Sequence, residues 1–598
     1  MGIPSYFSYI VKNHANVIRK LDATKFKTNN LYLDANSIIY DCVHKIDFTN
    51  LAPGNFEIIY KAVFDKIDEY ITLICPDSNI FIAFDGTAPV AKLEQQRQRR
   101  HKSLYQNKIA KAIMKRVEDP WNTTAITPGT KFMIGLNETL RKKYTNPATY
   151  NVKNIILSPS DKYGEGEHKL FEYIRAFPEQ HLGKNTVIYG LDADLIMLSI
   201  NHLPVNPNIY LFRETPEFIK SINSELDPNE SYMIDIPELA KIITLNMNNG
   251  EPLTTVAFEN PLLKKVEENG GPFGRGLPFG TRGEQNFVPF FQKGEQQSNR
   301  IYDYIFMCFF LGNDFMPHFP SVNIRTGGVD KMINAYKATI GNTTDNLTNG
   351  KTIYWKNVRK LVQFLADAEE VNFKKETALR DRRENQPLKK VEPKFCSTQP
   401  LEKVESKFCS TFSKSGEDEL KKFEAIPTYD RKMEKFINPF NPNWQRRYYK
   451  TLFNIEIDDV RRKQICVNYL EGLEWTMKYY TSGCADWRWC YKYDYPPLLS
   501  DLIHYIPYYE TEFIVKKKPA PVNELVQLCY VLPKECLQLL PTKICDRVLS
   551  EHSHWYTSEQ DCVYVWAYCR YFWEAHAQLP EIDIDELERF ILSTFEKG

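Results

Sequence analysis

The chain has 598 residues, enough for two or more domains, and its formal net charge at pH 7 is zero, so overall charge gives no sign of a polyanionic partner. The 13 cysteines include no CxxC pair and no Cys/His knuckle, which argues against a zinc module and favours reduced thiols in an intracellular protein. The N-terminus has no signal-peptide pattern, and the longest apolar run is too short to span a bilayer.

Residues 1–245 alternate short apolar runs with amphipathic segments, which is typical of an α/β fold. We expect a mostly parallel sheet flanked by helices, with functional groups beyond the carboxyl ends of its strands. Residues 246–300 are rich in glycine and predict a mobile insertion. Order should return at Ile301, and residues 301–384 should complete the first core with a helical segment.

A disordered linker is expected at residues 385–415, where one pattern occurs twice, from Lys390 and again from Lys403. Two short copies are too few to build a repeat fold. Residues 430–598 are rich in aromatic side chains and mainly helical by pattern, for example over 466–480. They should form a second lobe that packs beside the functional edge of the first.

Acidic residues follow several apolar runs. Asp34, Asp85 and Asp192 come at the ends of predicted strands, and Asp314 follows the run 309–313, which we interpret in the same way. A single acid after a strand is usually a turn former or a helix cap. Repetition of the pattern predicts a cluster instead. The full set is Asp34, Asp85, Glu165, Glu167, Asp192, Asp194 and Asp314.

Clustered carboxylates repel one another and raise their own pKa values unless a cation neutralises them. Oxygen ligands without His or Cys favour Mg²⁺ or Mn²⁺ over zinc. Two such ions about 4 Å apart can activate a water and stabilise the oxygens of a phosphodiester during hydrolysis. The set of seven therefore predicts a two-metal hydrolytic site.

Local spacing supports this prediction. Asp192 and Asp194 share a face if the strand before them continues through both residues. Glu165 and Glu167 would point apart in a regular helix, but Gly164 and Gly166 allow the backbone to bend before the helix begins.

The segment after Asp85 is basic, with nine Lys or Arg residues and one acid between Lys92 and Arg116. Such a run is most often a solvated helix face, but the scarcity of acids beside a predicted metal site favours a grip on phosphate. On a helix, one stripe would carry Lys92, Gln96, Arg99 and Arg100.

The order of motifs resembles the XRN-type 5′-to-3′ exoribonucleases, and the chain looks like a compact, divergent member. The matching segments are MGIPSYFSYI, LYLDANSIIY, FIAFDGTAPVAKLEQQRQRR, ITPGTKFM, GEGEHK, YGLDADLIML and FLGNDFMPHFP. A second family-like region begins at RRYYKTLF and continues over 469–501. Together they cover most of 1–230, 301–340 and 440–510.

The resemblance implies a PIN- or flap-nuclease-like core that degrades single-stranded RNA processively in RNA and mRNA decay. It implies that the enzyme starts from a 5′-monophosphate and releases nucleoside 5′-monophosphates. All seven carboxylates would be catalytic and would bind two Mg²⁺ ions, for which Mn²⁺ can substitute. By similarity, one ion takes Asp34, Asp85, Glu165 and Glu167, and the other takes Glu167, Asp192, Asp194 and Asp314. The 5′-phosphate would bind to Lys92, Gln96, Arg99 and Arg100, in a pocket too small for a cap or triphosphate.

The resemblance also implies stacking of the first base between two rings. Tyr40 stands where the family commonly has His, so an aromatic face is kept and the imidazole is lost. The opposite ring would be Trp487, in preference to Trp489, and Pro89 would lie at the entrance and help to exclude duplexes. Alternation of aromatic residues over 487–495 would place them on one face of an extended segment, as a core face or as a platform for bases.

Two other functions stay open: a structure-specific flap-type DNA nuclease with the same chemistry, and a catalytically inactive RNA-binding scaffold. The complete carboxylate set favours an enzyme, and the Ala-Pro-x-Ala-Lys segment with the aromatic region favours RNA ends. We expect a monomer that does not associate with membranes and acts in the cytoplasm, with decapping or RNA-decay factors as partners. The run 516–519, Lys-Lys-Lys-Pro, makes a nuclear location the alternative.

Overall fold

The computed structural model describes residues 5–22, 24–46, 55–114, 121–215, 219–227, 230–248, 300–385, 416–515 and 520–596. The basic run at 516–519 lies outside these residues, as does almost all of the predicted linker and of the predicted glycine-rich insertion. Within the described part, no helix combines the length and apolar character needed to cross a bilayer.

Seven strands in the described residues form one sheet in the order β1-β7-β6-β5-β2-β3-β4. Strands β4, β3, β2, β5 and β6 are parallel neighbours, and the edge strand β1 and its neighbour β7 pair antiparallel. The predicted mostly parallel α/β fold is therefore confirmed. The bounds are β1 Ile18–Lys20, β2 Asn30–Asp34, β3 Asn79–Ala83, β4 Asn154–Ser158, β5 Thr186–Tyr189, β6 Ile209–Arg213 and β7 Tyr232–Asp235.

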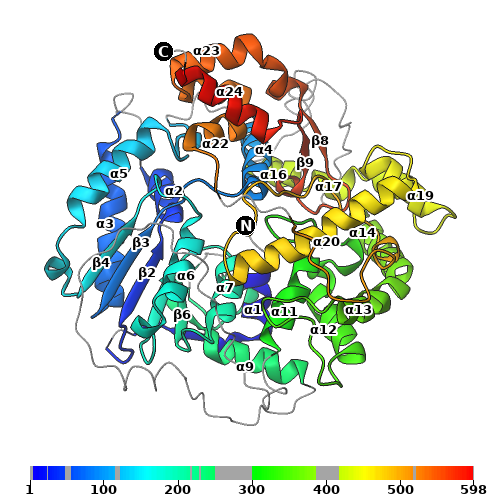
Figure 1. Cartoon of the computed structure of the whole chain (residues 1–598), viewed down its shortest axis with the longest axis horizontal. Coiled ribbons are helices and arrows are strands. Elements are labelled where there is room, and N and C mark those ends of the chain that lie inside the picture. The colour runs from blue at the N-terminus through cyan, green and yellow to red at the C-terminus, as the bar shows by residue number, and fades with distance from the viewer. Residues whose placement is uncertain are drawn as a thin grey trace.

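Helices cover both faces of the sheet (Figure 1). Alternate residues of β2 enter different cores: Leu31 and Leu33 pack with helices α2, α3 and α5, whereas Tyr32 packs with α6, α7 and α11. Fully buried strands alternate in this way because successive side chains point to opposite faces. The helices of this part are α1 Tyr6–Asn13, α2 Asn36–Lys45, α3 Glu57–Ile74, α4 Val90–Met114, α5 Lys131–Lys143, α6 Gly166–Ala176, α7 Asp194–His202, α8 Ile219–Ile222, α9 Ile236–Met247 and α11 Ile301–Cys308.

The later part of the chain is mainly helical, as predicted. Its longest helix, α20, runs through the middle of the molecule in Figure 1 and packs against α7 of the first part. The hairpin β8–β9 (Val563–Val565 and His576–Gln578) lies beside α4. The helices are α12 Gly328–Thr339, α13 Trp355–Asp367, α14 Glu369–Glu384, α16 Gly416–Glu424, α17 Ile426–Tyr429, α18 Lys432–Ile437, α19 Trp444–Leu452, α20 Asp459–Thr481, α21 Leu499–Leu502, α22 Glu524–Val531, α23 Thr542–Glu551 and α24 Ile584–Glu596.

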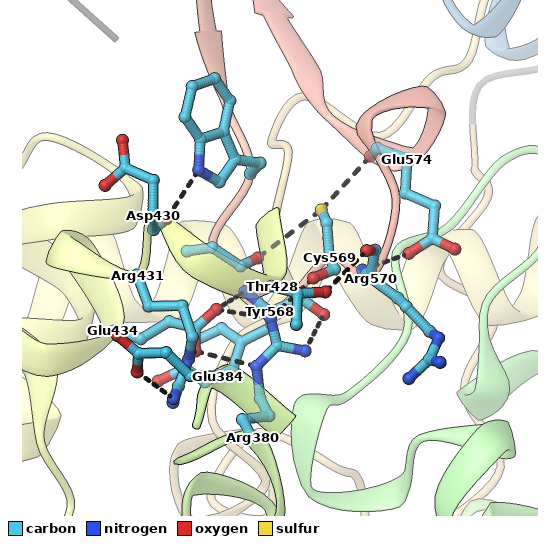
Figure 2. Close-up of polar contacts among 12 residues, drawn as sticks. Arg380, Glu384, Thr428, Asp430, Arg431, Glu434, Tyr568, Cys569, Arg570 and Glu574 are labelled. Atoms are coloured by element: carbon cyan, nitrogen blue, oxygen red, sulfur yellow. Dashed lines mark hydrogen bonds and ion pairs between the residues drawn. The ribbon is translucent and has the colours of Figure 1, made fainter. Parts of the chain in front are cut away.

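A buried ion-pair network joins α14, α18 and the loop between β8 and β9 (Figure 2). Arg380 donates from Nε and Nη2 to the two carboxylate oxygens of Glu434, over 2.8 and 2.7 Å. Arg431 donates from Nε to the same carboxylate over 2.7 Å. Glu434 also accepts the backbone N–H of Tyr568, a residue at φ +63°. One buried acid thus fixes two arginines and a left-handed turn.

Candidate active site

Three of the predicted acids lie at the carboxyl edge of the sheet. Strand β2 ends at Asp34, which pairs in register with Ala83, the last residue of β3, two positions before Asp85. On the other side of β2, Leu33 pairs with Tyr189, the last residue of β5. Because parallel strands in register end together, the segments that carry Asp34, Asp85 and Asp192 leave the sheet at one place.

Glycine at position 166 brings the next acids to this edge. Glu165 has an extended backbone and caps α6, whereas Glu167 lies in the first turn, as the flanking glycines predict. The Gly166 N–H donates to Asp85 Oδ1 over 2.7 Å. A Cβ atom on Gly166 would lie 2.5 Å from Asp34 Oδ1, closer than atoms can approach. Only glycine allows the start of α6 to approach these two carboxylates.

Two local predictions at the remaining acids are wrong. Strand β5 ends at Tyr189 and Asp194 is the first residue of α7, so Asp192 and Asp194 do not share a strand face. An acid in the first helical turn is favoured by the helix dipole. The run 309–313 before Asp314 is no strand: it begins with a 3₁₀ turn, Phe309–Leu311, that directly follows α11. This run is buried on all sides, and such a short run does not distinguish strand from helix by periodicity.

Lys92 lies among the carboxylates rather than beside them. Its ammonium pairs with Asp314 Oδ2 at 2.7 Å and also contacts Glu165. All three side chains are buried. Burial alone would lower the pKa of Lys92, but Asp314 and Glu165 raise it well above its usual value. The same attraction outweighs burial at Asp314 and lowers the pKa of that carboxyl. Lys92 is therefore charged and neutralises part of the cluster.

Three of the other acids are shifted toward their protonated form. Burial, followed by repulsion from Asp85 and Asp192, raises the pKa of Asp34 well above its usual value. Burial also raises the pKa of Glu167 well above its usual range, and with repulsion from Asp314 it raises the pKa of Asp194 to about 7. One lysine is thus not enough positive charge for this group of acids.

The carboxylates fit a hard divalent cation. Three of their oxygens, Asp34 Oδ1, Glu167 Oε2 and Asp194 Oδ1, are buried with no hydrogen-bond partner among the described residues. Among the described residues, no three His, Cys, Asp or Glu side chains lie close enough together to hold a metal ion. Oxygen atoms with unused lone pairs, and no sulfur or imidazole among the seven, suit Mg²⁺ or Mn²⁺.

The predicted basic stripe lies on α4. Arg99 and Arg100 both interact electrostatically with Tyr40 on α2, so the stripe and the predicted stacking ring lie close together. Gln96 is buried on the same helix. Burial lowers the pKa of Arg100 to about 10. Its Nη1 donates to the Thr124 carbonyl over 3.3 Å, and its buried Nε has no hydrogen-bond partner within the described residues. The stripe can therefore still accept an anion.

The chain matches two family models in sequence. Residues 1–215 match the XRN 5′–3′ exonuclease N-terminus, and residues 296–594, half of the chain, match the Xrn1 helical domain. The chain belongs to the XRN family of 5′–3′ exonucleases. The resemblance of its motifs to that family is thus confirmed, and the first model covers six of the seven acids, with Asp314 in the second.

Curated XRN relatives come from distant eukaryotes. The chain is 28% identical to the 5′–3′ exoribonuclease 2 homolog of Drosophila melanogaster over 89% of its own length and 64% of that protein. It is 27% identical to 5′–3′ exoribonuclease 2 of Gallus gallus over 90% of its length and 64% of the relative. It is 26% identical to 5′–3′ exoribonuclease 1 of Schizosaccharomyces pombe over 92% of its length and 45% of the relative. The chain thus spans less than two thirds of these relatives.

Helix α20 of the XRN helical domain adds residues that local sequence patterns do not reveal. The Tyr479 hydroxyl donates to Glu165 Oε1 over 2.7 Å, and the Tyr479 ring stacks on His168, with ring centroids 3.7 Å apart. On α2, Asn36 donates to Asp85 Oδ2 over 2.9 Å. Asn36 and His168 lie within the quoted motifs LYLDANSIIY and GEGEHK, whereas no local signal identifies Tyr479, which is 314 residues from Glu165.

The predicted entrance residues are partly brought together. The N–H of Val90, next to Pro89, donates to the Trp487 carbonyl over 3.0 Å. The Trp487 ring is only 8% exposed and meets Tyr163 edge-on at 5.6 Å. Residues 487–495 form no strand, and Trp489 stacks on Trp475 inside the first core. Trp489 is therefore a core residue, and a stacking role for Trp487 and Tyr40 stays a prediction.

Proposed function

We propose that this chain is a processive, Mg²⁺-dependent 5′-to-3′ exoribonuclease that degrades single-stranded RNA with a 5′-monophosphate. The observation that carries the proposal is the adjacency of two sites. Buried carboxylates, some of whose oxygens have no hydrogen-bond partner among the described residues, stand at the sheet edge, and Lys92 links them directly to the cationic helix α4. Membership of the XRN family supports the same activity.

Different residues would bind the 5′-phosphate, the metal ions and the first base. Lys92, Gln96, Arg99 and Arg100 would hold the 5′-phosphate, which places the first phosphodiester at the acids. Mg²⁺ held by the seven carboxylates would supply a water of lowered pKa and neutralise charge on the scissile phosphate. Tyr479 and Asn36 orient two of those carboxylates, and Tyr40 and Trp487 would stack on the first base.

RNA with a 5′-monophosphate is expected to be degraded at least about tenfold faster than RNA with a 5′-hydroxyl or a 5′-triphosphate. RNA with a 5′-hydroxyl cannot form the charge-assisted hydrogen bonds to the stripe, each of which contributes about 1.5–3 kcal/mol. A 5′-triphosphate is too large for the predicted pocket. The measurement is release of labelled mononucleotide in Mg²⁺ from RNAs that differ only at the 5′ end, with a DNA flap substrate in parallel.

Arg100→Met should bring the rates on 5′-monophosphate and 5′-hydroxyl RNA closer together, because it removes charge from the stripe alone. Arg141→Met, an exposed substitution on α5, is the matched control and should keep the preference. Equal wild-type rates on all three RNA ends would contradict the phosphate site, and faster cleavage of the DNA flap would favour the alternative nuclease.

Tyr479→Phe should raise the Mg²⁺ concentration needed for half-maximal activity by about tenfold and leave RNA affinity unchanged. The substitution removes only the hydroxyl that orients Glu165, and loss of such a partner typically costs 10- to 100-fold in metal affinity or activity. Mg²⁺ titrations of the initial rate, with RNA affinity measured separately, test this expectation.

Tyr448→Phe is the matched control, because its hydroxyl is also buried but donates to the Pro496 carbonyl at 2.9 Å, in a different core. It should not alter the Mg²⁺ requirement. An identical Mg²⁺ curve for both variants would show that Tyr479 only fills space.

We further propose that the chain acts as a monomer in the cytoplasm, with the nucleus as the alternative. Its substrates would then come from reactions that leave a 5′-monophosphate, such as decapping or endonucleolytic cleavage in RNA decay. Fractionation of cells that express the tagged chain tests the location.

A further inference from the structure

A cavity of about 680 Å³ lies against α4, on a face next to the phosphate stripe. At 3.6 residues per turn, Ala91, Gln98 and Lys102 lie on this second face, and Arg99 borders both. Asp314 of the carboxylate cluster lines the cavity, and so do Arg325 and Trp573. The cavity therefore reaches the proposed site of cleavage.

Three of the acids that line this cavity have partners. Glu574 pairs with Arg325 at 2.6 Å, and Asp494 lies 3.5 Å from the His576 ring. Glu94 accepts the Tyr530 hydroxyl over 2.7 Å. Of these contacts only the Arg325 pair neutralises charge, because the hydroxyl is uncharged and burial lowers the pKa of His576.

Lys102 is different, because no acid pairs with it in the described part of the chain. Its ammonium donates to the backbone carbonyl of Trp573 over 3.0 Å. Burial lowers the pKa of Lys102 to about 8, although the nearby acids Asp494 and Glu574 oppose that shift. Lys102 thus offers an ammonium group to the cavity without a direct ion pair to any described acid.

An aromatic ring and a further cation line the cavity beside Lys102. The Trp573 ring is nearly parallel to that of Tyr571, 6.0 Å away and inclined by 14°. The Arg325 guanidinium, which pairs with Glu574, lies 5.7 Å from each ring. A flat ring beside a guanidinium group suits a nucleobase.

We propose that this cavity receives the nucleoside 5′-monophosphate released at the carboxylate site, with its phosphate on Lys102 and its base toward Trp573. The inference rests on the proposed exonuclease activity. The volume lies within the range of small-ligand sites, about 300–1,000 Å³, and exceeds what a single nucleotide needs. Departure through this cavity would let the RNA chain stay bound on the stripe face of α4 between cleavages.

The test is binding of radiolabelled AMP by equilibrium dialysis to the full chain carrying Asp192→Asn, with and without saturating 5′-phosphorylated RNA. AMP is expected to bind while RNA occupies the stripe, and more tightly than adenosine. Adding Lys102→Met should weaken this RNA-resistant binding at least about tenfold, because a hydrogen bond to a charged phosphate is lost. Lys102→Arg should retain it, as should Lys142→Met, an exposed substitution on α5.

RNA affinity and melting temperature of each variant establish that it is folded. Displacement of all AMP by RNA, equal binding of adenosine, or indifference to Lys102→Met would each overturn the proposal. A wild-type protein that releases no mononucleotide from RNA would contradict the proposed activity. One that releases mononucleotides but has no RNA-resistant AMP site would contradict the cavity assignment alone.

Discussion

Glu167→Gln is expected to reduce mononucleotide release by at least about a thousandfold while RNA affinity stays within about threefold of wild type. Glu167 is buried in the first turn of α6, and its Oε2 has no hydrogen-bond partner in the described residues. Gln keeps the shape and removes one anionic metal ligand. Metal ions contribute several kcal/mol of transition-state stabilisation, and about 4 kcal/mol corresponds to a thousandfold in rate.

The comparison is Glu172→Gln, an exposed substitution on the same helix that should leave the rate unchanged. Asp192→Asn should behave like Glu167→Gln, because its carboxylate is also one of the seven. Single-turnover cleavage and fluorescence anisotropy with 5′-phosphorylated RNA separate chemistry from binding. Turnover retained in Glu167→Gln would refute the metal assignment, and loss of RNA binding would point to a structural defect.

The positions of the acids at strand ends could be predicted because the signal is local. A parallel strand buried on both faces is a short apolar run, and its carboxyl end is where the next polar residue must leave the sheet. Asp34, Asp85 and Asp192 follow this rule. The same reasoning failed before Asp314, where an equally apolar run forms a 3₁₀ turn at the end of α11, because full burial removes the periodicity that separates strand from helix.

The contacts that complete the site could not be predicted, because they join distant parts of the chain. The Tyr479 hydroxyl reaches Glu165 only after α20 packs against the first core, and the pattern of α20 gives a helix without saying which residue meets an acid. The stripe on α4 was predicted as one unit. Its first member, Lys92, instead pairs with Asp314 and Glu165, since a buried ammonium needs nearby anions.

Glu434→Ala is expected to lower the free energy of unfolding by about 3–5 kcal/mol. The Glu434 side chain is 2% exposed, and Arg380 and Arg431 are 6% and 1% exposed. Burial alone would lower the pKa of Arg380, yet Glu434 raises it above its usual value, so the pair stays charged. Removing the acid leaves two buried guanidinium groups without this counter-charge, which costs far more than an exposed pair. The Tyr568 N–H loses its acceptor as well.

Glu456→Ala is the matched control, because Glu456 also pairs with two cations, Arg446 at 3.0 Å and Lys450 at 2.8 Å, but is 49% exposed. Exposed pairs contribute about 0–1 kcal/mol, so its unfolding midpoint in urea should hardly move. The chain is too large for one two-state transition, so the comparison uses the first transition seen by both fluorescence and circular dichroism. Equal midpoints for the two variants would mean that water reaches the Glu434 network. A lower midpoint for Glu434→Ala alone would show that this buried network, which includes the β8–β9 loop, stabilises the fold.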